Sequence, residues 1–294
     1  MELLKGVEVS PFCRTIWVSQ EAKDTWSKVI PQISQFIQGL EVLSVEAGHR
    51  PVAWQTVGQQ QLVNETKRWA EMGLVSLTIK FVRAFNGFAH KHEEPIPGDP
   101  STNACVIVAR NMADCLAFKR AFERGDNVEQ GRLLGFPTCC CEFFRDVWCK
   151  GYYDPIWQAA TNTLEVIRQD GGVRHHRIRL KGHPFSNSIL RYVGLRIGFH
   201  IPCSFDCEDT IRVAQERFAL GKSTNPDLMV LAESLLRMPM SWDVLKGLAV
   251  VRTPIAYFIT SSVPCKERHI VEVEGDFIPK ESKKGLVYPF SEVK

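Results

Sequence analysis

Five of the ten cysteines in this 294-residue chain lie in two short clusters whose members could hold one metal centre. The first cluster ends the segment 135–141, after a glycine and a proline, and the second lies within residues 200–207. Each is expected where a helix begins, because free backbone N–H groups and the helix dipole favour thiolate over thiol there. Two such helix ends facing each other would form a pocket for a soft metal ion or an iron–sulfur cluster.

Cys139, Cys140, Cys203 and Cys207 are the predicted metal ligands. Structural zinc sites usually contain Cys-x-x-Cys pairs, and this sequence has none. An iron–sulfur cluster tolerates irregular spacing, because its iron atoms accept thiolates from several directions. A four-iron, four-sulfur cluster (4Fe-4S) is therefore the favoured cofactor, with zinc as the alternative. Two further interpretations stay open, namely a redox-active dithiol and small buried side chains without a ligand.

Four more residues are candidates for catalysis or substrate binding. His200 precedes Cys203 by three positions and could act as a general base, a metal ligand or a hydrogen-bond donor to a thiolate. Glu142 follows the first cluster and is a candidate acid/base group, or else a charge that complements the helix dipole. Asn187 and Arg191 are four residues apart, so a helix would direct both toward an anionic or amide-bearing ligand. Capping of nearby backbone is the other role open to this pair.

The segment between Asp170 and Asp206 contains no acidic residue. Its concentrated positive charge would suit a phosphate, a carboxylate or a nucleic-acid backbone. The alternative is a basic surface strand that pairs with acidic residues from other parts of the fold. The basic residues of this stretch are Arg174, Arg177, Arg179, Lys181, Arg191 and Arg196, with His175, His176, His183 and His200 among them.

The composition, at 45% hydrophobic and 23% charged residues, is that of a globular protein with a sizeable core. No run approaches the roughly 18 apolar residues that a membrane span requires, and residues 1–5 do not resemble a secretory signal. Ten cysteines without an export signal predict a reducing, cytoplasmic environment. The net charge of +3 does not by itself imply a polyanionic partner. The isolated cysteines are expected to be buried hydrophobic side chains, and they are Cys13, Cys105, Cys115, Cys149 and Cys265.

Hydrophobic periodicity predicts helices and strands along the chain. Pro31 lies inside the first helical segment and is expected to kink or divide it. The breaker-rich segment 93–100 is the expected internal boundary. Helices are predicted at residues 21–40, 59–72, 112–124, 128–134, 139–149 and 227–237, with partly helical structure at 187–198. Strands are predicted at residues 51–57, 75–82, 105–109, 173–180 and 270–274, with paired strands at 247–252 and 255–260.

The helix after the second cluster is expected to have Ser204 as its N-cap and to end at Leu220, with Gly221 as the stop. Thr138 is the expected N-cap of the helix at the first cluster. The spacing of four, three and four residues predicts one inward face in the later helix. Its members are Cys207, Ile211, Ala214 and Phe218.

These elements predict an α+β protein. A helix-rich central cysteine domain, residues 99–240, is expected between an N-terminal mixed α/β portion, residues 1–98, and a C-terminal β segment, residues 241–294. The sequence shows no internal repeat or coiled-coil heptad.

The two clusters lie in longer motifs that resemble a poorly characterised prokaryotic family. The family pattern is Gly-aromatic-Pro-x-Cys-Cys followed by His-x-Pro-Cys-Ser-x-x-Cys, and the likeness covers roughly residues 105–220. Asn187 and Arg191 also belong to the pattern, whereas Cys141 is an extra cysteine. The resemblance implies that four cysteines act together, and it supplies no activity. The matching residues are Gly135, Phe136, Pro137, Cys139, Cys140, Phe143 and Phe144, then His200, Pro202, Cys203, Ser204 and Cys207.

The leading hypothesis is a metalloenzyme, in which the cysteines hold a cluster or one metal and the basic residues bind an anionic small molecule, a nucleotide or a modified base. The alternatives are a zinc-stabilised nucleic-acid-binding module without catalysis and a thiol redox protein. Phosphate-binding loops of the Walker type, dinucleotide fingerprints and serine nucleophile elbows are absent from the sequence. The radical SAM cysteine motif is also absent, because Thr210 occupies the position of its third cysteine.

Overall fold

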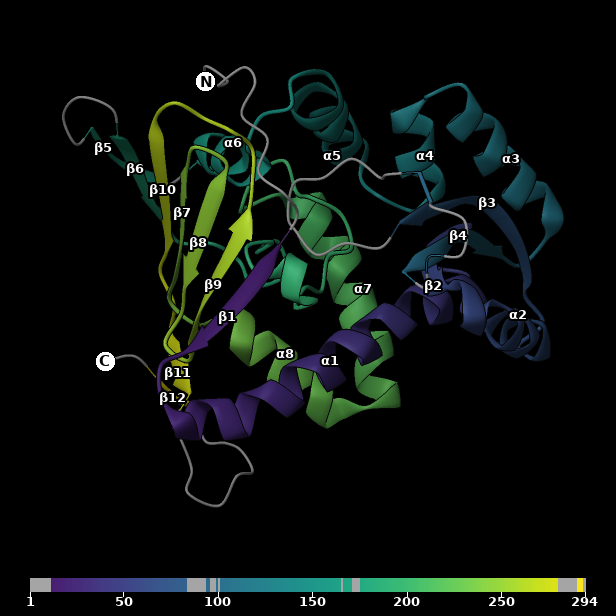
Figure 1. The fold of residues 1–294 in the computed structure, drawn as a ribbon, viewed down its shortest axis with the longest axis horizontal. Coiled ribbons are helices and arrows are strands. Elements are labelled where there is room, and N and C mark those ends of the chain that lie inside the picture. The colour runs from purple at the N-terminus through teal and green to yellow at the C-terminus, as the bar shows by residue number, and fades with distance from the viewer. Residues whose placement is uncertain are drawn as a thin grey trace.

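The computed structural model describes residues 12–83, 94–95, 99, 101–164, 166–170, 175–279 and 290–292. The predicted α+β class is confirmed: the two larger of the three sheets formed by the described residues lie at opposite ends of the molecule, with helices between them (Figure 1). The long helix α1 (Gln20–Glu46) runs from one sheet toward the other. The hydroxyl of Ser19 caps its N-terminus by accepting the backbone N–H of Ala22 at 3.0 Å.

The larger sheet has seven strands in the order β1-β9-β8-β7-β10-β6-β5. All neighbouring strands are antiparallel except β10 and β6, which are parallel. Segments far apart in the sequence therefore lie side by side in this sheet (Figure 1). The strands are β1 (Cys13–Trp17), β5 (Val166–Asp170), β6 (His175–Leu180), β7 (Met240–Leu245), β8 (Leu248–Arg252), β9 (Ala256–Ser261) and β10 (Arg268–Val273).

The main hydrophobic core joins this sheet to helices α1, α6 (Pro155–Thr161), α7 (Glu208–Thr224) and α8 (Pro226–Leu236). Trp26 of α1 and Trp242 of β7 are among its largest fully buried side chains. Burial of one such aromatic side chain contributes roughly 3 kcal/mol to folding. The indole N–H of Trp242 also donates to the carboxylate of Asp154, the N-cap residue of α6, at 2.8 Å. That bond fixes the position of α6 against the sheet.

The smaller sheet has the antiparallel order β2-β4-β3, and its central strand is buried on both faces. The end of α1 and helix α2 cover one face, and helix α3 covers the other. An apolar run such as residues 104–109 is typical of a strand with both faces covered. The elements of this unit are β2 (Val52–Gly58), α2 (Leu62–Glu71), β3 (Val75–Arg83), β4 (Thr102–Ala109) and α3 (Met112–Glu123).

Helices α4 (Asn127–Leu133) and α5 (Thr138–Phe143) lead from the smaller sheet to the first cysteine cluster, and a π-helical turn (Phe144–Lys150) follows. Gly135 lies between α4 and α5 with a φ angle of 71°, in the left-handed region that favours glycine. The backbone N–H of Phe136 bonds back to the carbonyl of Gly131 at 3.0 Å and closes the end of α4. This turn directs the chain into the cysteine-bearing helix.

Several helix ends differ from the prediction. Helix α7 begins at Glu208 with Cys207 as its N-cap residue, because residues 204–207 form a turn in which the N–H of Cys207 bonds to the carbonyl of Ser204 at 3.4 Å. The helix continues past Gly221 to Thr224, where Asn225 and a proline end it. Ser204 is therefore not the N-cap. In the first cluster the N-cap position belongs to Pro137 and not to Thr138.

Two further predicted helices also changed. Residues 187–198 contain only the short 3-10 turn Arg191–Val193, so Asn187 and Arg191 do not share a helical face. Helix α1 continues through Pro31 as one element. The strands β2, β3, β4 and β10 and the hairpin of β8 and β9 are confirmed, with shifts of one to three residues at their ends.

The segment 93–100 lies largely outside the described residues. The strands before and after it belong to one sheet, because β4 pairs with both β2 and β3. In the larger sheet, β1 pairs with β9 and β6 with β10. The sequence segments 1–98, 99–240 and 241–294 are therefore joined through shared sheets. Short strands β11 (Phe277–Pro279) and β12 (Phe290–Glu292) form a separate pair. Among the described residues, no helix combines the length and apolar character needed to cross a bilayer.

Candidate metal centre and adjoining cavity

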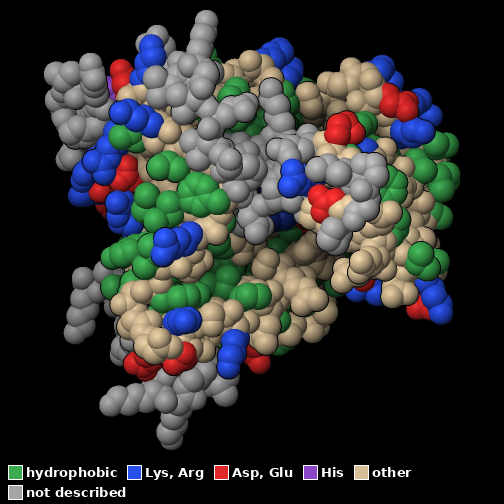
Figure 2. Space-filling view, viewed as in Figure 1, with side chains coloured by type: hydrophobic (Ala, Val, Ile, Leu, Met, Phe, Trp, Pro, Cys, Tyr) green, Lys and Arg blue, Asp and Glu red, His purple; other side chains and the backbone are tan. Residues whose placement is uncertain are grey.

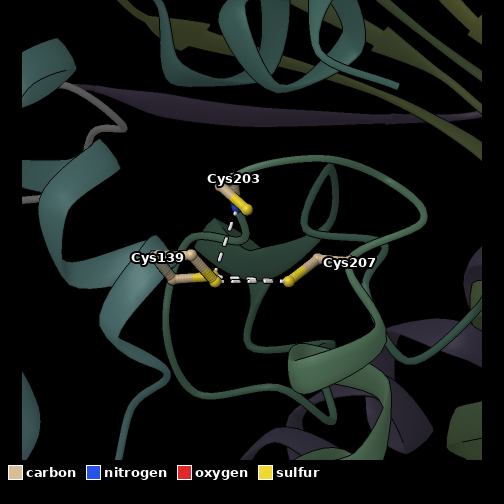
Figure 3. A group of neighbouring side chains, drawn as sticks. Cys139, Cys203 and Cys207 are labelled. Carbon is tan, nitrogen blue, oxygen red and sulfur yellow. Dashed lines mark hydrogen bonds between the residues drawn. The ribbon is translucent and has the colours of Figure 1, made fainter. Parts of the chain in front are cut away.

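The four predicted cysteine ligands meet at one point. The Sγ of Cys139 lies 3.9 Å from that of Cys140 and 3.8 Å from that of Cys207, although the latter is 68 residues away in sequence. The sulfurs of Cys140 and Cys207 are 3.7 Å apart. With Cys203 included, all four sulfurs lie within 4.8 Å of one another. In Figure 3 the labelled side chains point toward one another from two separate segments. Such a group could hold a metal ion or a metal cluster.

Helix starts position these cysteines, as the sequence predicts. Cys139 and Cys140 lie in the first turn of α5, where the N–H of Cys140 bonds to the carbonyl of Pro137 at 3.0 Å. Cys207 is the N-cap residue of α7. Cys203 lies in the preceding loop, and its backbone N–H donates to the sulfur of Cys140 at 3.4 Å. The loop and the two helix starts therefore converge through backbone contacts as well as through thiols.

The loop that carries Cys203 is anchored by the segment after α6. The side-chain amide of Asn162 donates to the carbonyl of Cys203 at 2.9 Å. The hydroxyl of Thr163 accepts the backbone N–H of Phe205 at 3.0 Å, and the carboxylate of Asp206 accepts a backbone N–H of the same segment at 2.9 Å. These bonds hold the loop in the position that brings its cysteines to α5.

The sulfurs divide their charge unequally. The pKa of Cys207 is far below the ordinary thiol value, because the thiols of Cys140 and Cys203 donate hydrogen bonds to it. The pKa of Cys140 is raised, because its thiol bonds to the sulfurs of Cys203 and Cys207 and is buried. Negative charge therefore collects on Cys207. Thiolate is the form that binds metals, so Cys207 could act as a metal ligand in this state.

Thr210 connects the cysteine group to His200. Its hydroxyl lies 3.3 Å from the sulfur of Cys140 and 2.8 Å from Nε2 of His200. Burial and the charge of Arg217 lower the pKa of His200 to about 3, so the ring is neutral near pH 7. In the part of the chain that the structure describes, the buried Nδ1 of His200 has no hydrogen-bond partner. A ligand in reach of this ring could use that nitrogen.

A cavity of about 510 Å³ adjoins the cysteine group, and Cys140 and His200 form part of its wall. Trp54 of β2, Gln130 of α4 and Trp148 of the π-helical turn line other parts. The volume is in the range of small-molecule sites, which also combine aromatic walls with a few polar groups. The cavity therefore lies between the smaller sheet and the loop 200–207.

The structure separates the predicted substrate-binding residues. Arg191 lines the cavity, and burial and the charge of Arg196 lower its pKa to about 10, which leaves it charged near pH 7. Asn187 is buried elsewhere: its amide donates to the carbonyl of Leu236 at 3.1 Å, and its oxygen accepts the N–H of Ile189 at 3.1 Å. Asn187 thus has the alternative role of binding nearby backbone.

The two predicted catalytic residues are also separated. His200 lines the cavity, as described above. Glu142 is exposed on α5 and is not among the cavity-lining residues. Its position one residue after the cysteines does not bring its carboxylate to the site, because neighbouring residues on a helix point about 100° apart.

Cys141 is outside the sulfur group. It is buried, its thiol donates to the carbonyl of Phe136 at 3.7 Å, and it packs against Gly131 of α4. Cys105, Cys115 and Cys265 are buried, as expected for isolated cysteines. Cys149 is exposed and Cys13 is half-buried, so these two differ from that expectation.

The basic stretch between Asp170 and Asp206 divides into two parts. On β6, Arg177 and Arg179 pair with Glu272 of β10 at 3.0 and 3.3 Å, which is the surface-strand alternative. On the face seen in Figure 2, Lys and Arg side chains are scattered among acidic and polar ones. Arg191 and Arg196 instead line the cavity. Arg174 lies outside the described residues.

Sequence reasoning missed Arg50, Thr210 and Arg217. The predicted inward face of helix α7 is confirmed in part: Cys207 and Ala214 are buried, and Phe218 packs half-buried against the main core. The helix also buries Thr210, Arg217 and Gly221, so its inward side is wider than the predicted face. In the sequence, the only signal for this wider side is an arginine at helical spacing from small residues.

Comparison with known proteins found no match from which the role of this site could be read. None of the protein-family models, curated proteins or solved structures matches the chain. The chemistry of the site is therefore inferred from its own residues.

Proposed function

We propose that this protein is a metalloenzyme that acts on an anionic small molecule bound in the cavity beside its cysteine group. The proposed metal ligands are Cys139, Cys140, Cys203 and Cys207, the same four cysteines that the motif resemblance assigns to joint action. The observation that carries the proposal is that Cys140 belongs both to the sulfur group and to the cavity wall. All ten cysteines are free thiols, which supports a reducing, cytoplasmic environment.

The sulfur distances favour one metal ion over the 4Fe-4S cluster expected from the sequence. Four thiolates at about 2.3 Å from a tetrahedral zinc ion lie about 3.8 Å from one another. The sulfurs of Cys139, Cys140 and Cys207 lie 3.7, 3.8 and 3.9 Å from one another, and all four sulfurs lie within 4.8 Å. In a four-iron cluster each thiolate binds a different iron atom, so the ligand sulfurs are on the order of 6 Å apart. Zinc is therefore the first choice and a single iron ion the second.

Four thiolates complete the coordination of a tetrahedral ion, so the ion would hold α5 and the loop 200–207 together. The residues that face the substrate are then His200 and Arg191. The neutral ring of His200 offers Nδ1 to a substrate hydrogen bond, and Arg191 supplies a positive charge. Glu142 has no part in this proposal, because it is exposed and away from the cavity wall.

The nucleic-acid-binding alternative has less support. It needs a free basic surface, and Arg177 and Arg179 are instead paired with Glu272. The thiol redox alternative stays open to the same test as the metal, because both depend on the four sulfurs.

The first prediction is about one zinc per chain and no acid-labile sulfide in protein purified without oxygen. Elemental analysis, a sulfide assay and the visible spectrum measure this. Cys203→Ala is expected to lose most of the metal, because it removes one of four ligands and unties the loop. Cys149→Ala, at an exposed cysteine outside the four-sulfur group, is the matched control and should keep the metal.

Two results would contradict this proposal in different ways. Four irons with stoichiometric sulfide would establish a cluster in place of a single ion. Protein without metal in every preparation, with the four thiols titratable, would favour thiol chemistry instead.

A further inference from the structure

Two buried arginines stack on the same pair of aromatic rings behind the cavity wall. The guanidinium carbon of Arg50 lies 5.5 Å from the ring centre of Phe136 and 5.6 Å from that of Phe199. That of Arg217 lies 6.0 and 4.3 Å from the same two centres. Phe136 and Phe199 themselves line the cavity. Stacking on a ring face fixes the plane of a guanidinium and leaves its N–H edge available.

These arginines join the two cavity-lining arginines around a single carboxylate. Glu41 lies 3.5 Å from Nη1 of Arg50 and 3.2 Å from Nη2 of Arg196. Among the described residues, no carboxylate lies within ion-pair distance of Arg191 or Arg217. Four positive charges therefore surround one negative charge. We call these four arginines, Arg50, Arg191, Arg196 and Arg217, the arginine cage.

The remaining acid near the cage does not balance it. Glu216 on α7 attracts Arg217 electrostatically, but it is a surface residue whose carboxylate lies 3.7 Å from Arg212. Among the described residues around the cage, the positive charges therefore outnumber the negative ones.

Several polar atoms of the cage are buried without a partner. Within the described part of the chain, Nη1 of Arg217, Nε of Arg196 and both Nη atoms of Arg50 make no hydrogen bond, although Arg50 and Arg196 lie at ion-pair distance from Glu41. Burial and the charge of Arg50 lower the pKa of Arg217 to about 9, yet the group stays charged near pH 7. A buried charge without a partner destabilises a fold strongly. A fold that keeps Arg217 and Arg191 without a paired carboxylate among the described residues is expected to use this positive charge for an anionic ligand.

We propose that the cavity takes a nucleotide whose phosphate group binds Arg191 and Arg196, the two cage arginines that line the cavity, while Arg50 and Arg217 add positive charge from behind its wall. This inference rests on the proposed function, because it identifies the anion that the cavity accepts. Guanidinium groups bind phosphate through paired N–H donors, and three unbalanced positive charges match a phosphate dianion better than a single carboxylate. A phosphate bound by Arg191 and Arg196 would neutralise part of the positive charge on this side of the cavity.

The rest of the cavity suits a planar base. Trp54, Phe144 and Trp148 supply aromatic surface, and Gln38 and Gln130 supply amides that can bind the edge of a heterocycle. Aromatic side chains stack on any nucleobase and contribute roughly equally to each, so the walls alone do not select the base. A volume of about 510 Å³ accommodates a mononucleotide-sized ligand.

The test uses the full-length, metal-loaded protein and three probes: the four ribonucleoside 5′-monophosphates, the four nucleosides and inorganic phosphate. Calorimetric titration and thermal unfolding measure binding. At least one monophosphate is expected to bind saturably and raise Tm, and its nucleoside to bind at least tenfold more weakly. Arg191→Gln and Arg217→Met should each weaken the monophosphate at least tenfold. Arg212→Gln is the matched control on α7, since Arg212 is exposed, and should bind as the unmodified protein does.

A stability measurement separates a ligand role from a structural one. Without ligand, Arg217→Met should unfold at the same temperature as the unmodified protein or higher, because it removes an unbalanced buried charge. If that variant does not fold, Arg191→Gln decides the question alone. The proposal is overturned if no monophosphate binds, if nucleosides bind as tightly, if inorganic phosphate binds as tightly as every monophosphate, or if the cage variants bind normally. Metal-loaded protein without nucleotide binding overturns this inference alone, whereas nucleotide binding by protein that never contains metal overturns only the metal centre.

Discussion

At the scale of single residues, Cys140 connects the two halves of the site. Its sulfur lies 3.7 Å from that of Cys207, accepts the backbone N–H of Cys203 and lies 3.3 Å from the hydroxyl of Thr210. The same side chain lines the cavity. A change at the sulfur group is therefore transmitted to the cavity wall through one residue, and through Thr210 to His200.

Thr210→Val tests this connection, because valine keeps the shape of threonine and removes its hydroxyl. The expected result is a metal affinity about 10- to 100-fold lower, since partners of metal ligands typically contribute that much. Competition with a chromophoric chelator measures the affinity. Thr224→Val, at the exposed end of the same helix, is the control and should bind metal normally. Equal affinities for both variants would show that the hydroxyl does not support the cysteine group.

At the scale of elements, the turn between α4 and α5 determines where the first cluster points. Gly135 has a φ of 71°, and a Cβ placed there would lie 2.9 Å from Cβ of Arg50. The turn therefore needs glycine both for its backbone conformation and for the close approach of an arginine of the cage. Gly125 also has a positive φ, at 66°, but a Cβ there would meet no atom within 4 Å.

Gly135→Ala and Gly125→Ala form a matched pair. Both should destabilise the protein by about 1 kcal/mol through the left-handed conformation alone. Gly135→Ala is expected to cost roughly 2–3 kcal/mol in total, because the contact with Arg50 adds strain. Denaturant unfolding measures both. Equal losses in the two variants would mean that Arg50 moves aside freely.

Helix α6 provides a pH-dependent contact with the larger sheet. Burial raises the pKa of its N-cap residue Asp154 to about 6, although Trp242 and the N–H of Ile156 donate to the carboxylate. The native state therefore binds this proton more tightly than the unfolded chain does. The resulting stabilisation is complete below about pH 4 and is lost as the pH rises through 6.

Asp154→Asn removes this titration and keeps an oxygen acceptor. Between pH 4 and pH 7, the free energy of unfolding of the unmodified protein should fall relative to the variant by roughly 3 kcal/mol. Denaturant unfolding across this range measures the difference between the two proteins. Any pH dependence that comes from the cysteines is the same in both and does not affect this difference. Parallel curves for the two proteins would contradict the raised pKa.

At the scale of the whole molecule, the proposed ion connects parts that come from opposite ends of the fold. α5 follows the smaller sheet, whereas the loop 200–207 leads into α7 and the main core (Figure 1). A ligand that binds only the folded state stabilises it according to its concentration and affinity. Metal removal should therefore loosen this junction more than either sheet.

Hydrogen exchange with and without a strong chelator tests this expectation. Residues 137–141 and 200–210 should lose protection when the metal is removed, and Tm should fall by several degrees. The central strand β4, which is buried on both faces, should keep its protection and serves as an internal control. Uniform loss of protection over both sheets would show that the metal stabilises the fold as a whole.

Local sequence signals predicted much of the fold. The hairpin of β8 and β9 and the strands of the smaller sheet follow from period and breakers. The helices beside both clusters begin within a few positions of the prediction, although neither Thr138 nor Ser204 is the N-cap. Helix faces were less certain: α7 buries Arg217 as well as packing Phe218 against the core. Periodicity alone did not place an arginine on the inward side, because a charged residue is buried only where the surrounding tertiary structure accommodates it.

By itself, the sequence determined which cysteines are close to one another along the chain and that each cluster begins a helix, because caps and turns act over three to five residues. Only the tertiary structure decided that the sulfurs of Cys139 and Cys207 lie 3.8 Å apart. It also decided that Arg50 and Arg217 stack on the same rings behind the cavity wall. Such contacts depend on the packing of whole helices and sheets, and no local pattern encodes the position at which distant segments meet.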